Sequence, residues 1–165
     1  MYIVSKCLLG YDCKYNGGNN KNDNVIEFCK THDYVTICPE MDGGLESPRP
    51  PAEIVKGTDG EVRVINTVGT DVTFQFTAGA ENSLNTVMEE LSSRGSGARI
   101  EGAILKANSP SCGYGTVYDG TFTHTKVKGS GIFTEALLKA FDAHDPFAEY
   151  FKIVDENGIS ELVNK

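Results

Sequence analysis

Short apolar runs and segments of helical periodicity alternate along this chain of 165 residues. Three apolar runs that stand between polar segments have the length of buried strands. They are residues 2–5, 34–38 and 102–106. Three other segments repeat apolar residues at intervals of three and four, as amphipathic helices do. They are about residues 24–32, 77–93 and 132–144. The alternation predicts an α/β fold, in which one domain of residues 1–165 builds a mostly parallel, Rossmann-like central sheet with helices on both faces.

The remaining segments carry weaker signals. Residues 61–66 alternate weakly and predict an edge strand or one arm of a hairpin, and residues 150–154 and 159–163 predict two short strands. Four prolines between residues 39 and 53 remove backbone donors at short intervals, so this segment is expected to lack regular structure. Residues 107–124 are expected to form a loop.

Three of the five cysteines follow predicted strands. Cys7 comes after the first apolar run, Cys38 after the second, and Cys112 shortly after the third. Ligand-binding groups collect outside the carboxyl ends of strands in an open α/β sheet, so these cysteines are expected to meet in space. Thiolates favour iron–sulfur clusters and zinc, but a zinc site normally shows a close CxxC pair, which this chain lacks. Three thiolates without an obvious fourth partner suggest a metal cluster with an open coordination position.

Charge restricts the class of partner. The formal net charge is −8 at pH 7 and no run of Lys or Arg exceeds two residues, which disfavours binding to bulk nucleic acid. A single tRNA-like or nucleotide ligand stays open, because Lys14, Arg49 and Lys106 lie close in sequence to the three cysteines. No glycine-rich fingerprint for a nucleotide cofactor occurs. We find no signal-peptide pattern and no apolar stretch of membrane-spanning length, so a cytoplasmic protein with reduced cysteines and no membrane partner is expected.

Several motifs resemble those of the DUF523 family. They are residues 4–10 (VSKCLLG), 13–18 (CKYNGG), 38–40 (CPE), 43–45 (GGL), 48–49 (PR), 69–73 (GTDVT), 109–113 (SPSCG) and 118–122 (YDGTF). The resemblance extends over about residues 2–140. It implies a 2-thiouracil desulfidase-like activity with a [4Fe-4S] cluster, and a small-molecule thiolated pyrimidine as the substrate.

The resemblance also implies roles for particular residues. Cys7, Cys38 and Cys112 match the three cluster ligands, which leaves the fourth iron open, and Glu40 and Ser109 match positions that handle protons or position the substrate. In the expected mechanism the thiocarbonyl sulfur binds the open iron, which acts as a Lewis acid without changing oxidation state. Water then attacks the carbon of the C=S bond, with Glu40 as the general base.

Three weaker candidates accompany these residues. Ser111 is expected to assist Ser109 in relaying a proton or positioning the ring, and Arg49 and Lys106 are expected to balance the cluster's negative charge or to bind an anionic group. Structural interpretations stay open beside the functional ones. Serines next to a proline are common turn formers, Glu40 can cap the proline-rich loop, and the two basic residues can be solvated loop charges.

Other chemistry-bearing residues have separate expectations. Cys13 follows Cys7 by six residues, and three roles stay open for it: a fourth cluster ligand, a thiol that carries sulfur, or a packed side chain. Cys29 stands on the apolar face of its helix and is expected in the core. The histidines occur in no metal-ligand spacing and are expected at the surface or in loops. They are His32, His124 and His144.

Two other classes of function stay open. A sulfur-transfer enzyme that acts on tRNA or a nucleoside would use the same cluster to deliver sulfide, whereas a non-enzymatic protein would bind metal or cycle between thiols and a disulfide. Both a monomer and a homodimer are compatible with the sequence.

Overall fold

The computed structural model describes residues 1–58, 60–141 and 151–163. At its centre, four parallel strands form a sheet in the order β2-β1-β5-β8. The strands are β1 (Tyr2–Ser5), β2 (Tyr34–Ile37), β5 (Gly102–Leu105) and β8 (Lys152–Asp155). In this sheet β2 lies on one side of β1, and β5 and β8 lie on the other side. The direction of winding therefore reverses between β1 and β5, which is where open α/β sheets bind ligands.

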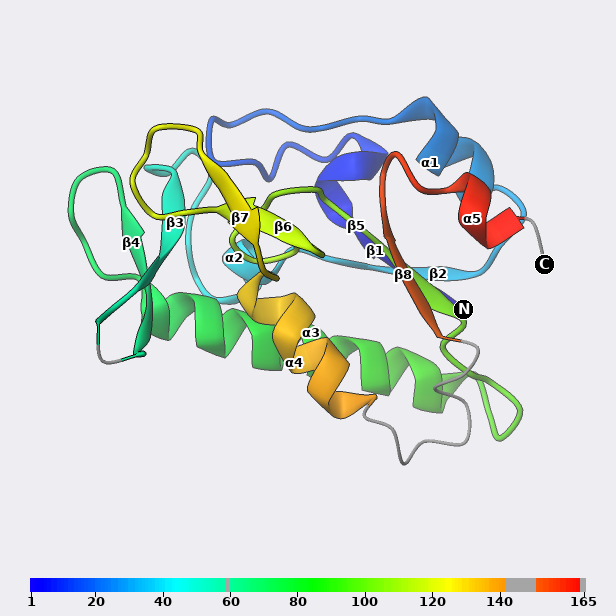
Figure 1. Ribbon diagram of the computed structural model, residues 1–165. Coiled ribbons are helices and arrows are strands. Elements are labelled where there is room, and N and C mark those ends of the chain that lie inside the picture. Colours follow the sequence, from blue (N-terminus) through cyan, green and yellow to red (C-terminus); the bar gives the residue numbers. More distant parts are fainter. Residues whose placement is uncertain (59, 142–150, 164–165) are drawn as a thin grey trace.

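Helices cover both faces of this sheet (Figure 1). They are α1 (Asp23–Cys29) and α5 (Ser160–Val163) on one face, and α3 (Thr73–Ser93) and α4 (Ile132–Ala140) on the other. Successive residues of β1 point to opposite faces. Ile3 packs in the cluster that contains α3 and α4, whereas Tyr2 and Val4 pack with α1 and α5. The predicted α/β fold with a parallel sheet and helices on both faces is confirmed.

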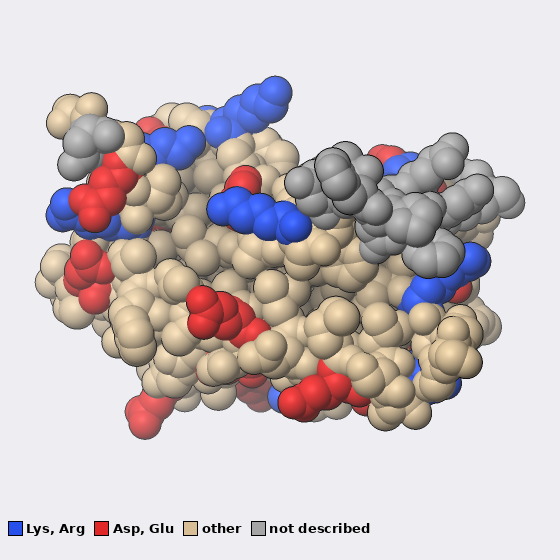
Figure 2. Space-filling model, turned by 90° about the horizontal axis from the view of Figure 1, so that it is seen from below, with Lys and Arg blue, Asp and Glu red and all other residues tan. Residues whose placement is uncertain are grey.

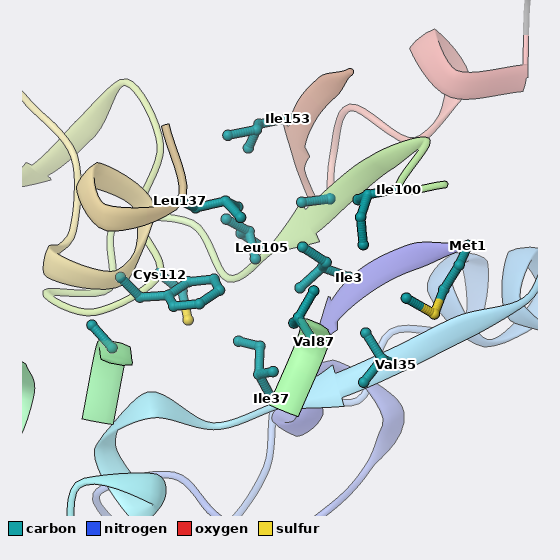
Figure 3. Close-up of a cluster of buried hydrophobic side chains, with 13 residues drawn as sticks. Met1, Ile3, Val35, Ile37, Val87, Ile100, Leu105, Cys112, Leu137 and Ile153 are labelled. Atoms are coloured by element: carbon teal, nitrogen blue, oxygen red, sulfur yellow. The ribbon is translucent and has the colours of Figure 1, made fainter. Parts of the chain in front are cut away.

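The larger buried cluster joins the sheet to α3 and α4. In Figure 3, Ile3 and Leu105 of the sheet face Val87 of α3 and Leu137 of α4. All four side chains are fully buried, and burial of an aliphatic side chain of this size contributes about 1.5–3 kcal/mol. Cys112 belongs to the same cluster. The loop that carries this cysteine is therefore anchored in the hydrophobic core.

Two antiparallel hairpins stand beside the carboxyl ends of the sheet strands (Figure 1). They pair β3 (Ala52–Lys56) with β4 (Val62–Asn66), and β6 (Thr116–Tyr118) with β7 (Lys126–Lys128). A smaller apolar cluster, which includes Ile54, Phe76 and Val117, packs the two hairpins against the start of α3. The weakly alternating segment 61–66 is thus one arm of a hairpin, as predicted.

The proline-rich segment contains more regular structure than we predicted. α2 (Pro39–Asp42) begins directly after Cys38, and β3 begins at Ala52, so the expectation of irregular structure over residues 39–53 was wrong at both ends. Pro39 occupies the first turn of α2, where a missing backbone N–H removes no hydrogen bond. Proline content alone therefore misled the prediction.

Several other boundaries also differ from the prediction. The expected strand at residues 159–163 is the helix α5, because Ile159 and Leu162 lie three residues apart and are both buried in the core. β6 lies inside the segment expected to be a loop, and α3 begins at Thr73 rather than near residue 77. α4 ends at Ala140, and the last three residues of the predicted helix, His144 among them, lie outside the described residues.

The outer face of α3 and α4 is mixed in charge. Figure 2 shows Lys and Arg side chains that stand apart from one another, with Asp and Glu between them, over the part of this face that described residues form. Within residues 1–58, 60–141 and 151–163, no helix combines the length and the apolar character needed to cross a membrane.

The helix α2 rests directly on α3. A Cβ atom added to Gly43 or to Gly79 would overlap a backbone carbonyl oxygen of the neighbouring helix, so the two backbones touch. Next to this contact, the buried Ser83 hydroxyl of α3 donates a hydrogen bond of 2.5 Å to Asp42 Oδ2. These contacts fix the short helix that follows β2.

We expect Gly79→Ala to lower the free energy of unfolding by about 1–3 kcal/mol, because the new methyl group must displace the backbone of α2. The clash has to outweigh the gain of about 1 kcal/mol that alanine normally brings to a helix interior. Gly97→Ala is the matched control, since Gly97 has open space at its Cβ position. Urea denaturation measures both variants, and equal stabilities would contradict the close contact.

Candidate metal centre and active site

Three strands of the sheet end at one cavity of about 570 Å³. Cys7 lies in a single 3-10 turn, η1 (Lys6–Leu9), which directly follows β1, and Cys38 directly follows β2. Cys112 lies in the loop after β5. All three residues line the cavity. The structure thus brings the three predicted cysteines together at the carboxyl end of the sheet, beside the reversal between β1 and β5.

A fourth thiol lies among them. Cys13 is buried, lines the same cavity and is hydrogen-bonded to the thiols of both Cys38 and Cys7. These hydrogen bonds, together with burial, raise the pKa of Cys13 far above its ordinary value. The same bonds lower the pKa of Cys38 and lower that of Cys7 to about 7. Proton binding at Cys13 is therefore coupled to proton binding at Cys7 and Cys38.

The surroundings of Cys7 also favour its thiolate. Asn20 Nδ2 donates a hydrogen bond to Cys7 Sγ at 3.4 Å, and the Asn20 backbone N–H donates to the Cys7 carbonyl oxygen at 3.0 Å. The charge of Lys106 lowers the pKa of Cys7 further, while the charge of Glu156, directly after β8, raises it. The long glycine- and asparagine-rich loop is thus folded back onto the first cysteine.

Cys112 is the most protected of the three cysteines. Burial raises the pKa of its thiol, and hydrogen bonds from the hydroxyls of Ser5 and Ser111 oppose that effect. Ser109 Oγ accepts hydrogen bonds from the backbone N–H groups of Ser111 and Cys112 at 3.2 and 3.1 Å. Ser109 therefore has the turn-forming role common for serine, and it holds the loop so that Cys112 faces the cavity.

A chain of hydrogen bonds connects Glu40 to the serine pair. Arg49 Nε donates to Glu40 Oε2 at 2.7 Å, and Ser111 Oγ donates to Glu40 Oε1 at 3.2 Å. The hydroxyls of Ser111 and Ser109 are hydrogen-bonded at 3.0 Å. Glu40 comes from the first turn of α2, after β2, and the serines come from the loop after β5. The network therefore bridges the carboxyl ends of two strands.

The two basic candidates line the cavity, but their polar groups are bound to other parts of the protein. Arg49 bonds to Glu40 and donates through Nη2 to the backbone carbonyl of Cys13 at 2.9 Å. Lys106 forms an ion pair with Glu156. These contacts favour a role for Arg49 in positioning Glu40, and a role for Lys106 in holding the loop after β5.

The remaining sequence candidates lie in different surroundings. Cys29, the last residue of α1, packs against the core, as expected, and burial raises its pKa to about 11. His32 stacks on the ring of Phe28 at a centroid distance of 3.9 Å. His124 lies in a loop, as expected, but this loop lines the cavity.

One wall of the cavity was not predicted from the sequence. Glu53 of β3 lines it together with Tyr118 and Phe122 of the β6–β7 hairpin. The segment 39–53 was expected to be irregular and the segment 107–124 to be a loop, so neither was expected to present a fixed wall. One signal was available, since Glu53 is a single charged residue at the start of a short apolar run.

We expect Arg49→Met to lower the free energy of unfolding by about 3–5 kcal/mol, because it leaves the Glu40 carboxylate largely buried without its cation. Arg63→Met is the matched control, since Arg63 pairs with Glu61 at the surface, where such pairs contribute about 0–1 kcal/mol. Adding Glu40→Gln to Arg49→Met should restore part of the loss. Chemical denaturation measures all three variants, and a cost for Arg49→Met no larger than that of the control would contradict a buried positioning pair.

Comparisons with known proteins identify the family of the chain. A family model described as 2-thiouracil desulfurase matches residues 2–144. The chain is 35% identical over 168 residues to YbbK of Bacillus subtilis (strain 168), a protein described as uncharacterized, and the match covers 99% of this chain and 100% of YbbK. It also resembles the solved structure of the [4Fe-4S]-dependent thiouracil desulfidase TudS, with a TM-score of 0.74 and 33% identity over 98% of this chain and 94% of the TudS chain. The resemblance found from the motifs is confirmed, and the chain belongs to the 2-thiouracil desulfurase (DUF523) family.

Proposed function

We propose that this protein is a [4Fe-4S]-dependent desulfidase that converts a thiolated pyrimidine of the 2-thiouracil kind into uracil and sulfide. One observation carries the proposal: thiols from the ends of three strands line the same cavity as the network of Glu40, Ser111 and Ser109. The solved structure that the chain resembles over almost its whole length is that of a [4Fe-4S]-dependent thiouracil desulfidase. A volume of about 570 Å³ is also typical of pockets for small molecules.

The donor set fits an iron–sulfur cluster. All five cysteines are free thiols, a state that fits the reducing cytoplasm, where we place the protein. Among the described residues no three His, Cys, Asp or Glu side chains lie close enough to hold a single metal ion. A cluster has no such requirement, because each thiolate binds a different iron. We assign Cys7, Cys38 and Cys112 as ligands. Held by these three thiolates, a cluster would supply Lewis-acid chemistry towards the thiocarbonyl sulfur of the substrate.

Glu40 is the general base in this proposal. Arg49 fixes Oε2, so that Oε1 faces the serine pair. The carboxylate takes a proton from the water that adds to the carbon of the C=S bond. Ser111 and Ser109 then pass a proton towards the ring nitrogen. The C=S bond is replaced by a C=O bond, so both protons of the water are removed from its oxygen and leave with the sulfide, and any proton lent to the ring nitrogen is returned. No atom changes its oxidation state.

Alanine at Cys7, Cys38 or Cys112 should strongly reduce the iron and acid-labile sulfide bound after anaerobic reconstitution, which we expect at about four of each per chain in the wild-type protein. Cys29→Ala is the matched control and should keep both, because Cys29 ends α1, packs against the core and does not line the cavity. Elemental analysis and the visible spectrum measure the outcome. Full cluster content in Cys38→Ala, or a colourless wild-type protein, would contradict the ligand assignment.

Glu40→Gln should leave the visible spectrum of the cluster unchanged and lower turnover of 2-thiouracil by about 10²–10⁴-fold, because the amide cannot accept a proton from water. Glu46→Gln is the control, since Glu46 is exposed nearby on the segment after α2. Release of uracil and sulfide under anaerobic conditions measures both variants. Wild-type turnover by Glu40→Gln would sink the assignment of the base.

A further inference from the structure

One wall of the cavity is aromatic and comes from a single hairpin. Tyr118 ends β6, and Phe122 and His124 lie in the turn between β6 and β7. The rings of Tyr118 and His124 meet edge to face, with a centroid distance of 6.2 Å and an interplanar angle of 76°. None of these residues takes part in the proposed chemistry at the thiols or at Glu40. The wall therefore needs its own explanation.

The turn holds two of these residues in a rarely populated backbone conformation. Phe122 and His124 have φ values of 59° and 62°, in the left-handed region that bulky residues seldom adopt. Such conformations persist only where surrounding contacts enforce them, and they gather at ligand-binding sites. Here hydroxyl and carboxylate groups of the turn provide part of these contacts, because Asp119 Oδ1 accepts hydrogen bonds from the backbone and the hydroxyl of Thr121.

A buried carboxylate holds the turn from the neighbouring hairpin. Glu53 Oε2 accepts the backbone N–H groups of Gly120 and Phe122 at 2.9 and 3.0 Å, and the Glu53 side chain is only 8% exposed. Gly120 lies so close to β3 that an added Cβ would stand 2.7 Å from the Ile54 carbonyl oxygen. The turn is thus fixed on β3 at its tip.

The second oxygen of Glu53 has a different environment. In the part of the chain that the structure describes, no group donates a hydrogen bond to Oε1, and the only fully buried side-chain oxygen or nitrogen without a partner is Gln75 Oε1. Glu53 Oε1 is therefore not sealed in the interior. Glu53 lines the cavity together with the aromatic residues, so the cavity is the place where a ligand could reach this acceptor.

We propose that Glu53 and Phe122 form the recognition site for the substrate ring. Glu53 Oε1 accepts a hydrogen bond from a ring N–H, and the Phe122 ring stacks on the face of the heterocycle, with Tyr118 and His124 beside it. The ligand class is a planar, neutral heterocycle with at least one ring N–H, which includes thiouracils and uracil. This inference rests on the proposed function and names the residues that select its substrate.

Binding of uracil to the cluster-loaded protein tests the proposal without relying on turnover. We expect Phe122→Ala to weaken uracil binding about tenfold, because stacking of a base on an aromatic ring is lost. Glu53→Gln should also weaken it about tenfold, because the amide oxygen still accepts the two backbone N–H groups while its NH₂ group replaces the acceptor in the cavity. Isothermal titration calorimetry measures the affinities, with Phe74→Ala and Glu46→Gln as exposed controls.

A ligand without ring N–H groups separates the two contacts. We expect 1,3-dimethyluracil to bind weakly and equally to the wild-type protein and Glu53→Gln, but more weakly still to Phe122→Ala. Unchanged uracil affinity in both variants, equal binding of uracil and its dimethyl form, or no measurable binding by the wild type would overturn the proposal. Loss of the visible cluster spectrum in Glu53→Gln would do so too, because it would show a structural role for the carboxylate.

The proposal can fail independently of the proposed function. Wild-type protein that binds uracil through Glu53 and Phe122 but leaves 2-thiouracil intact would contradict only the desulfidase activity. Protein that turns over 2-thiouracil while both variants bind uracil normally would contradict only the recognition site.

Discussion

The pairing of β1 with a parallel strand on each side is the constraint on which the site depends. Tyr2 lies opposite Tyr34 of β2 and Gly102 of β5, so the three strands run in a common register. Both faces of β1 are buried, and a slip of one residue would exchange the side chains that pack against each layer of helices. The thiols that follow these strands therefore take their relative positions from the register of the sheet. Local sequence alone would not bring them together.

The positions of the polar side chains in the site are also fixed by hydrogen bonds within the protein, which form without a ligand. Glu40 is held by Arg49 and Ser111, and Cys7 by Asn20 and Cys13. Groups held in this way in a cavity of low dielectric need little rearrangement during a reaction. The close backbone contact between α2 and α3 also keeps Glu40 in place, because it fixes the helix that carries this residue.

The sequence predicted those parts of the site whose position follows from a local pattern by a general rule of protein folds. Apolar runs located the strands, and the rule for the carboxyl ends of parallel sheets then placed Cys7, Cys38 and Cys112 together. Roles for Glu40 and Ser109 came only from the family resemblance, since a glutamate after a proline and a serine before one are common in turns. Their joint network required coordinates, because it spans two distant segments.

The wall formed by Glu53 and the β6–β7 hairpin escaped prediction for a different reason. All three residues of β7 are exposed, so the strand has no apolar pattern and forms only because β6 pairs with it. The helix α5 is a single turn, and one pair of apolar residues at a spacing of three, Ile159 and Leu162, is too short a pattern to predict a helix by itself. In both cases the structure depends on tertiary contacts, which cannot be predicted from the local sequence.

The register between β1 and β5 also sets an order of events during synthesis of the protein. Tyr2 pairs with Gly102, so Cys7 and Cys112 meet only after about a hundred intervening residues have been made and a non-local strand pair has closed. Such pairings form late, because the entropy of closing a long loop must be overcome first. A nascent chain that has emerged only as far as α3 already contains Cys7, Cys13 and Cys38, but it lacks both the central partner strand and the third strand-end thiol. A cluster held by all three strand-end thiols, as proposed, could therefore form only after β5 has paired with β1.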